Sequence, residues 1–161
     1  MRKLKPILTG RIILALTALV LGLIVFFSLN SAKYSLSDSP KNEINLKIGS
    51  AQITAEVEQT PESIIQGLSE RKSLEENSGM YFVLGEKKIA TFWMKDMLFS
   101  LDIIWIDNGK IVGINENVSV PTNDIIPTYT STQPITHILE VNAGFASKHN
   151  IEVGSTVEAT N

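Results

Sequence analysis

The stretch that decides the fold is Asp102–Ile114, DIIWIDNGKIVGI, because it contains two strand-like segments and the turn that joins them. Asp102–Asp107 is apolar on both faces, which is typical of a strand in the middle of a sheet. Asn108-Gly109 is a residue pair favoured in two-residue hairpin turns, and Lys110–Ile114 then returns antiparallel. The stretch therefore predicts a central β-hairpin.

Further strand-like segments precede this hairpin. Glu43–Ile48 and Ala51–Glu58 are separated by Gly49-Ser50, which predicts a second hairpin. Gly79–Leu84 and Ile89–Met94 are short apolar runs of the kind found in buried strands. The N-terminal half of the folded part is therefore predicted to be rich in short strands.

The segments after residue 118 are less regular. Three prolines between residues 121 and 134 predict a loop and an irregular sheet edge. Ile135–Val141 predicts one more strand, and Thr156–Glu158 alternates as a short strand near the end of the chain.

Two short helices are predicted between the strands. Thr60 is suited to cap free backbone amides and Pro61 suits the first helical position, which predicts a helix from Pro61 to about Leu68. Asn142 is placed to cap a second helix, Ala143–Lys148. The fold class is therefore mainly β (α+β): a compact, barrel-like or rolled antiparallel sheet with one or two short helices.

The N-terminal part of the chain carries a membrane signal. Ile12–Leu29 contains no charge over eighteen residues and follows four basic residues. As a helix rising about 1.5 Å per residue it spans about 27 Å, close to the thickness of the hydrocarbon core of a bilayer. We expect a single transmembrane helix at residues 12–29, with the basic flank at residues 1–11 on the cytoplasmic side.

The rest of the chain is expected to face away from the cytoplasm. Residues 30–42 are rich in serine and other polar groups, which predicts a flexible tether. Residues 43–161 would then form an extracytoplasmic β domain, periplasmic in a two-membrane bacterium. The alternative is a signal peptide cleaved near Ser31-Ala32, which would release a secreted domain.

Composition excludes several function classes. The chain of 161 residues has a net charge of −3, but four of its fourteen basic residues precede the apolar run. The remainder carries about −7 and lacks the basic stripe that neutralises phosphates, so no nucleic-acid partner is expected. With no cysteine, and with two histidines outside any metal-ligand motif, the sequence predicts neither a metal site nor a cofactor.

The densest group of chemically distinctive residues is Thr91–Met97, TFWMKDM, with Asp102 shortly after it. An indole face stacks against sugar rings or cations, so Trp93 predicts a stacking floor, with Lys95 and Asp102 orienting polar groups of a ligand. The alternative is that Trp93 lies in the core while Lys95 pairs with an acid at its rim.

Glu140 is an acidic residue inside the apolar segment Ile138–Val141. A buried carboxylate needs a partner, and Arg71 or Lys95 would form a structural ion pair with it. In the alternative interpretation, Asp102 and Glu140 are the two carboxylates of a hydrolase, which requires them to lie about 5 to 9 Å apart across a cleft.

Several short motifs follow one another in a specific order over residues 43–159. They are Thr60, Gly67-Leu68, Arg71, Leu74, Gly79-Met80, Phe82, Phe92-Trp93-Met94-Lys95, Leu101-Asp102-Ile103-Ile104, Gly109 and Leu139-Glu140-Val141-Asn142-Ala143-Gly144. This order resembles domain-of-unknown-function family 192, a widespread prokaryotic family of uncharacterised conserved proteins, and the Phe-Trp-Met-Lys block is its most specific motif. The chain departs from the family pattern at Asp96-Met97, where members usually have Asn-Thr, and at Ser100, where they commonly have Pro.

The resemblance implies a compact, mainly β fold that is frequently exported or membrane-tethered, and it names no reaction. It makes the residues that match the motifs the first candidates for a ligand site: Arg71, Trp93, Lys95, Asp102, Glu140 and Asn142.

These observations lead to one functional hypothesis and two alternatives. The first is a membrane-anchored extracytoplasmic domain that binds a small polar ligand or a cell-envelope component near Trp93, Lys95 and Asp102. The second is an envelope-carbohydrate hydrolase that uses Asp102 and Glu140. The third is a non-catalytic protein-interaction module, which would expose an apolar patch away from Trp93.

Overall fold

The computed structural model describes residues 42–122 and 125–160. The predicted cytoplasmic flank, the transmembrane anchor and the tether up to residue 41 lie outside these described residues. Within the described part, neither helix is long and apolar enough to cross a membrane.

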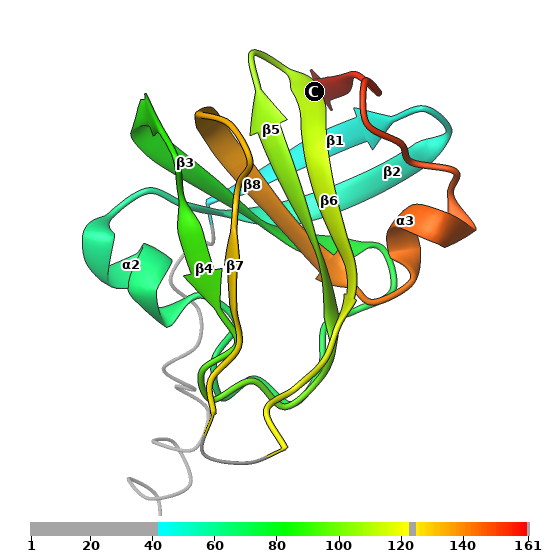
Figure 1. Cartoon of the computed structure of the whole chain (residues 1–161). Coiled ribbons are helices and arrows are strands. Elements are labelled where there is room, and N and C mark those ends of the chain that lie inside the picture. Colours follow the sequence, from blue (N-terminus) through cyan, green and yellow to red (C-terminus); the bar gives the residue numbers. More distant parts are fainter. Residues whose placement is uncertain (1–41, 123–124, 161) are drawn as a thin grey trace, which may run out of the picture. The chain divides into compact units, whose positions relative to one another are not determined.

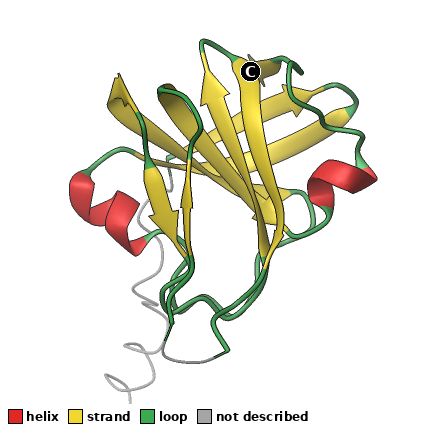
Figure 2. Ribbon diagram, viewed as in Figure 1, coloured by secondary structure: helices red, strands yellow, loops and turns green. Residues whose placement is uncertain are grey.

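The described part is mainly β, with two short helices, as the sequence predicts (Figures 1 and 2). Its elements in chain order are β1 (Glu43–Ile48), β2 (Ala51–Glu58), α2 (Pro61–Gln66), β3 (Ser78–Lys88), β4 (Thr91–Trp93), β5 (Leu101–Asp107), β6 (Lys110–Val118), β7 (Thr128–Thr130), β8 (Ile135–Asn142), α3 (Phe145–Lys148) and β9 (Val157–Thr160).

Seven of the strands form one curled sheet in the order β6-β5-β8-β3-β2-β1-β9. The sheet curls into a half-barrel, in which the two edge strands approach each other at one end (Figure 1). There the Ile111 amide donates to the Ser155 carbonyl at 3.0 Å, and the Val157 amide donates to the Gly109 carbonyl at 2.9 Å. The predicted rolled, barrel-like sheet is therefore confirmed as a half-barrel.

The sheet is not purely antiparallel, and this part of the prediction is wrong. β2 and β3 pair in parallel, with Ala55 opposite Gly79 and Val57 opposite Tyr81. Parallel neighbours need a crossover connection, and the segment between residues 59 and 77, which includes α2, provides it. The crossover carries α2 to one side of the sheet, away from α3 (Figure 1).

The central hairpin β5–β6 forms as predicted. Asp107 is opposite Lys110, and the two turn residues Asn108 and Gly109 have φ angles of 48° and 71°. Positive φ at both central positions defines the turn type whose twist matches that of the flanking strands.

Each face of the sheet carries its own apolar core. Side chains alternate along β5, so Ile104 and Ile106 lie in one core while Ile103 and Trp105 lie in the other. The first core consists of Leu46, Ile48, Ala51, Ile53, Ala55, Ile104, Ile106, Ile111, Leu139, Val141, Phe145, Ala146 and Ile151. The second core consists of Leu68, Met80, Phe82, Ala90, Met94, Met97, Leu101, Ile103, Trp105, Val118, Ile135 and Ile138.

The two helices differ from the predictions at their ends. α2 begins with the predicted Thr60 cap, whose hydroxyl accepts from the Ser63 amide at 3.2 Å, but it ends at Gln66 because Gly67 adopts a φ of 48°. α3 spans Phe145–Lys148 with Gly144 at its N-cap, so the predicted cap at Asn142 is wrong.

The proline-containing segment after β6 includes one short strand. β7 pairs antiparallel with β4, with Phe92 opposite Tyr129, and the two strands form a separate ribbon. In Figure 1 this ribbon runs beside α2. The predicted strand Ile89–Met94 is thus shortened to β4, which lies in the ribbon and not in the large sheet.

Candidate functional site

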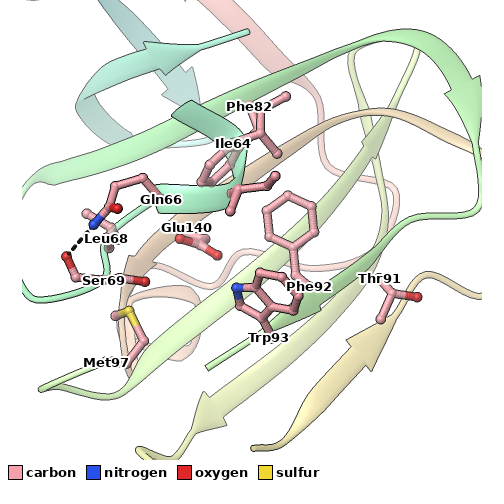
Figure 3. Close-up of a pocket in the computed structure, with 12 residues that line it drawn as sticks. Ile64, Gln66, Leu68, Ser69, Phe82, Thr91, Phe92, Trp93, Met97 and Glu140 are labelled. Carbon is pink, nitrogen blue, oxygen red and sulfur yellow. Dashed lines mark hydrogen bonds between the residues drawn. The ribbon is translucent and has the colours of Figure 1, made fainter. Parts of the chain in front are cut away.

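A pocket of about 120 Å³ opens on the second-core face of the sheet, next to α2 and β4 (Figure 3). It is lined by Ile64, Ile65, Gln66, Gly67, Leu68, Ser69, Phe82, Thr91, Phe92, Trp93, Met97 and Glu140. Most of these side chains are apolar, and one of them is ionisable. An apolar pocket with few polar groups is the usual form of a small-molecule site.

The ionisable group is the carboxyl of Glu140 on β8. Its cross-strand neighbours are Met80 on β3 and Ile103 on β5, both buried in the second core. Glu140 is 5% exposed, and no hydrogen bond or ion pair joins its carboxyl to any described residue. Burial among apolar neighbours raises the pKa of Glu140 to about 8. At neutral pH the pocket therefore presents a predominantly protonated carboxyl.

Two aromatic residues of β4 stand beside this carboxyl (Figure 3). Phe92 is anchored by edge-to-face contacts with Phe82 and Trp105, with ring centroids 4.9 and 6.1 Å apart. Trp93 is 46% exposed and lines the pocket, so it lies at the boundary between pocket and solvent. The core position considered for Trp93 is therefore wrong, and its role in ligand binding stays a prediction.

The turn after α2 is fastened to the segment that follows β4. The Ser69 hydroxyl donates to the Lys95 carbonyl at 2.9 Å, and the Glu70 amide donates to the Asp96 carbonyl at 2.8 Å. These bonds hold the Gly67–Ser69 wall of the pocket against the segment that carries Met97. Asp96 has a φ of 56°, a backbone conformation that Asp and Asn adopt more readily than most residues.

Arg71 does not contact Glu140, contrary to one of the two predicted pairings. Its guanidinium donates to both carboxylate oxygens of Glu56 at 2.6 and 2.7 Å. The hydrogen bond with Glu56 raises the pKa of Arg71. Glu56 and Glu140 both lie opposite Met80 in the sheet, so Met80 separates the paired carboxylate from the unpaired one.

Lys95 does not provide the other predicted partner. Its side chain is about half exposed, and its ammonium group lies 3.9 Å from the Asp96 carboxylate. Lys95 is also absent from the pocket lining, although its backbone carbonyl helps to hold the pocket wall. The expectation that a cation neutralises Glu140 is therefore wrong for both Arg71 and Lys95.

Asp102 is fully buried, but on the opposite face of the sheet. One of its oxygens accepts from the Asn117 amide at 2.8 Å and the Gly144 amide at 3.0 Å, and the other accepts from the Ala146 amide at 2.9 Å. Asp102 thus supplies the side-chain cap of α3 that was expected from Asn142. Asp102 shares a face with Ile104 and Glu140 shares one with Ile103, so these carboxylates do not flank a common cleft and the predicted hydrolase pair does not form.

Asn142 supports the site from a distance. Its amide nitrogen donates to the Leu74 carbonyl at 3.2 Å and to the Glu75 carbonyl at 2.9 Å, which ties β8 to the loop between α2 and β3. Of the six predicted site residues, the structure thus places Trp93 and Glu140 in the pocket and the other four outside its lining.

Sequence reasoning missed Phe82, Met97 and the wall formed by residues 64–69. Apolar residues of this kind carry no chemical signal of their own. Residues 64–69 meet Glu140 because the parallel β2–β3 pairing carries α2 across the second-core face, and neither spacing nor periodicity indicates that crossover. Phe82 reaches the pocket from β3, which pairs with β8, the strand of Glu140.

The donor set gives no support for a metal centre. No group of three or more His, Asp or Glu side chains close enough to hold an ion occurs among the described residues. A single carboxylate among apolar side chains is a poor cation cage, since metal sites need several ligands. The chemistry available in the pocket is therefore hydrogen bonding and ion pairing by one carboxyl, together with aromatic contact.

Two solved structures and one family model are similar to this chain. A crystal structure from Sinorhizobium meliloti 1021, of a protein provisionally described as a transcription regulator, is 28% identical with a TM-score of 0.69, and the match covers 76% of this chain and 98% of that one. A protein of unknown function from Novosphingobium aromaticivorans DSM 12444 is 27% identical with a TM-score of 0.64, covering 72% and 84%. No curated protein matches the chain. The model of the DUF192 family, described as "Uncharacterized ACR", matches residues 44–159, and the chain therefore belongs to domain-of-unknown-function family 192.

Proposed function

We propose that this domain binds a small molecule in the pocket over Glu140. The observation that carries the proposal is a carboxyl that is almost completely buried, has no partner among the described residues and lines an apolar pocket open to solvent. A buried polar group without a hydrogen bond costs about 1 to 3 kcal/mol. A ligand that forms a hydrogen bond with the Glu140 carboxyl removes this cost. The same buried carboxyl that lowers the stability of the domain would then contribute to its affinity for the ligand.

The walls of the pocket define what such a ligand looks like. Phe82, Phe92 and Trp93 offer aromatic surface to an apolar or ring-shaped body, while Glu140 offers one hydrogen-bonding point. A small polar ligand or a fragment of an envelope component with an apolar side fits this description. Because Lys95 and Asp102 lie outside the lining, the proposed site is narrower than the one expected from the sequence.

The proposal is tested by a thermal-shift screen of the full chain in lipid nanodiscs against amines, glycans, peptidoglycan fragments and nucleotides. A ligand that binds only the folded state raises the melting temperature. We expect the shift to disappear in Glu140→Gln and Trp93→Ala and to persist in the control Lys95→Ala, which changes a neighbouring residue outside the pocket. A shift that survives both pocket variants, or that is lost in the control alone, would contradict the proposed site.

We further propose that the domain is anchored at the membrane by residues 12–29 and faces away from the cytoplasm. The uncharged run and the basic residues before it support this location. Two measurements on cells test it. The protein should resist carbonate extraction from membranes, and protease should cleave the domain from the extracytoplasmic side. Extraction by carbonate together with protection from the protease would contradict the proposed location.

A non-catalytic protein-interaction role remains an alternative prediction. It is supported if no small molecule raises the melting temperature and a partner protein co-purifies with Trp93→Ala as well as with wild type, because the interaction surface predicted for this role lies away from Trp93.

A further inference from the structure

Glu140 is the one ionisable side chain among the described residues that line the pocket. The groups around it come from four elements, and none of them titrates near neutral pH: Ile64, Ile65 and Gln66 from α2, Phe82 from β3, Thr91, Phe92 and Trp93 from β4, and Ile103 from β5. Met97 and the turn Gly67–Ser69 complete the wall. The pocket thus carries a single potential negative charge and no positive one.

The two basic residues that the sequence suggests as partners of Glu140 lie beside other carboxylates. Arg71 holds both oxygens of Glu56, and Lys95 lies beside Asp96 on the exposed side of the loop. Glu56, which pairs with Arg71, is separated from Glu140 in the sheet by Met80. An ionised Glu140 would therefore meet no counter-ion from the described part of the chain.

The aromatic walls favour a positive ligand for an independent reason. The face of an indole or phenyl ring carries partial negative charge, so it attracts cations, and this attraction strengthens where water is excluded. Figure 3 shows Glu140 between the side chains of α2 and those of Phe92 and Trp93. A cation placed next to the carboxyl is thereby also placed next to aromatic rings.

We propose that the pocket binds an organic cation, an ammonium group on an apolar body, with Glu140 as its counter-ion and Trp93 and Phe92 as its aromatic walls. This inference rests on the proposed small-molecule function and specifies the class of ligand. The apolar lining excludes strongly hydrated metal ions, whereas alkylated ammonium groups lose little hydration on entering such a pocket.

Ion pairing of this kind makes binding release a proton. Because the pKa of Glu140 is about 8 in the empty pocket, roughly nine-tenths of the carboxyls are protonated at pH 7. A permanent cation binds the ionised form, so its binding at pH 7 should release about 0.9 proton. Its affinity should rise about tenfold between pH 7 and pH 9 as the ionised fraction increases from roughly 0.1 to 0.9.

Isothermal titration of the full chain in nanodiscs tests this with a matched pair of probes. Choline carries a fixed positive charge, and 3,3-dimethyl-1-butanol is its neutral analogue of the same shape. Tetramethylammonium and n-butylammonium complete the panel. We expect at least one cation of the panel to bind, choline to bind at least tenfold more tightly than the alcohol, and proton release to appear as a dependence of the heat on buffer.

Two variants separate a specific ion pair from a general attraction to an acidic protein. Glu140→Gln should remove the preference for choline, the proton release and the pH dependence. Glu62→Gln, which removes an exposed charge of the same type from α2, should change none of them. Circular dichroism confirms that both variants are folded.

The outcomes also distinguish the two proposals. If the alcohol binds as tightly as choline, or if binding shows no proton release, the cation inference is wrong while the pocket remains a small-molecule site. If no cation of the panel binds, the cation inference is again overturned, and the broader screen decides the proposed function independently.

Discussion

Replacing Glu140 with glutamine should change how the stability of the domain depends on pH. The pKa of Glu140 is raised by burial from 4.5 to about 8, so the folded state holds its proton over a range in which the unfolded state has lost it. Stability falls with rising pH wherever the folded state binds more protons. The contribution of the protonated carboxyl is therefore fully present below pH 4.5 and is lost as the pH rises to about 8 and beyond.

The magnitude follows from the size of the shift. One pKa unit corresponds to about 1.4 kcal/mol, so wild type should lose about 2.5 kcal/mol relative to Glu140→Gln between pH 5 and pH 7. A further 1 to 2 kcal/mol should be lost by pH 9. Such a loss is a large share of the 5 to 15 kcal/mol that stabilises a typical domain.

Urea denaturation of both proteins at pH 5, 7 and 9 provides the measurement. Groups other than Glu140 titrate in both proteins and cancel in the difference between their free energies of unfolding. Parallel stability curves over this range would refute the reasoning, because they would mean that Glu140 ionises as easily in the folded state as in the unfolded chain.

Three further substitutions test the structural roles of residues near the site. Asp102→Asn replaces the oxygen that accepts from the Ala146 amide by a donor, so it should lower the free energy of unfolding by about 2 to 4 kcal/mol and leave ligand affinity unchanged; wild-type stability in urea would contradict this. Arg71→Lys loses the two-pronged contact with Glu56 and should cost about 1 kcal/mol at low salt, and a difference that does not shrink at high salt would argue against an ion-pair effect. Gly109→Ala places a methyl group on a residue with a φ of 71°, so it should lower the free energy of unfolding by about 1 kcal/mol. An unchanged urea midpoint would contradict this and show that the turn relaxes.

Local features of the fold could be predicted from the sequence, and non-local ones could not. The Asn108-Gly109 turn and the Thr60 cap depend on residues within a few positions of each other, and both form as expected. The parallel pairing of β2 with β3 depends on where the chain goes after α2, and no short pattern encodes that choice. The cap of α3 comes from Asp102, more than forty residues earlier in the chain.

The same distinction applies to the candidate site. Glu140 was recognisable because an acidic residue in an apolar strand is unusual, and Trp93 because of its aromatic and charged neighbours. What the sequence did not reveal is that Glu140 has no partner in the described structure. Arg71 was an equally good candidate for pairing with Glu140 until the register placed Glu56 beside it. Identifying a missing partner requires knowing all neighbours in space.

The pairing of β1 with β9 has a consequence for how the chain reaches its native state. Asn45 on β1 lies opposite Thr160 on β9, 115 positions later in the chain. The outer edge of β1 is therefore covered only after β9, the last strand, has docked. Contacts between such distant segments must overcome the entropy of closing a long loop. We therefore expect the domain to fold slowly, on a timescale of milliseconds to seconds. Before β9 docks, the unpaired backbone groups of β1 can pair with a strand of another molecule. Removing residues 157–160 should therefore make this edge a site of self-association.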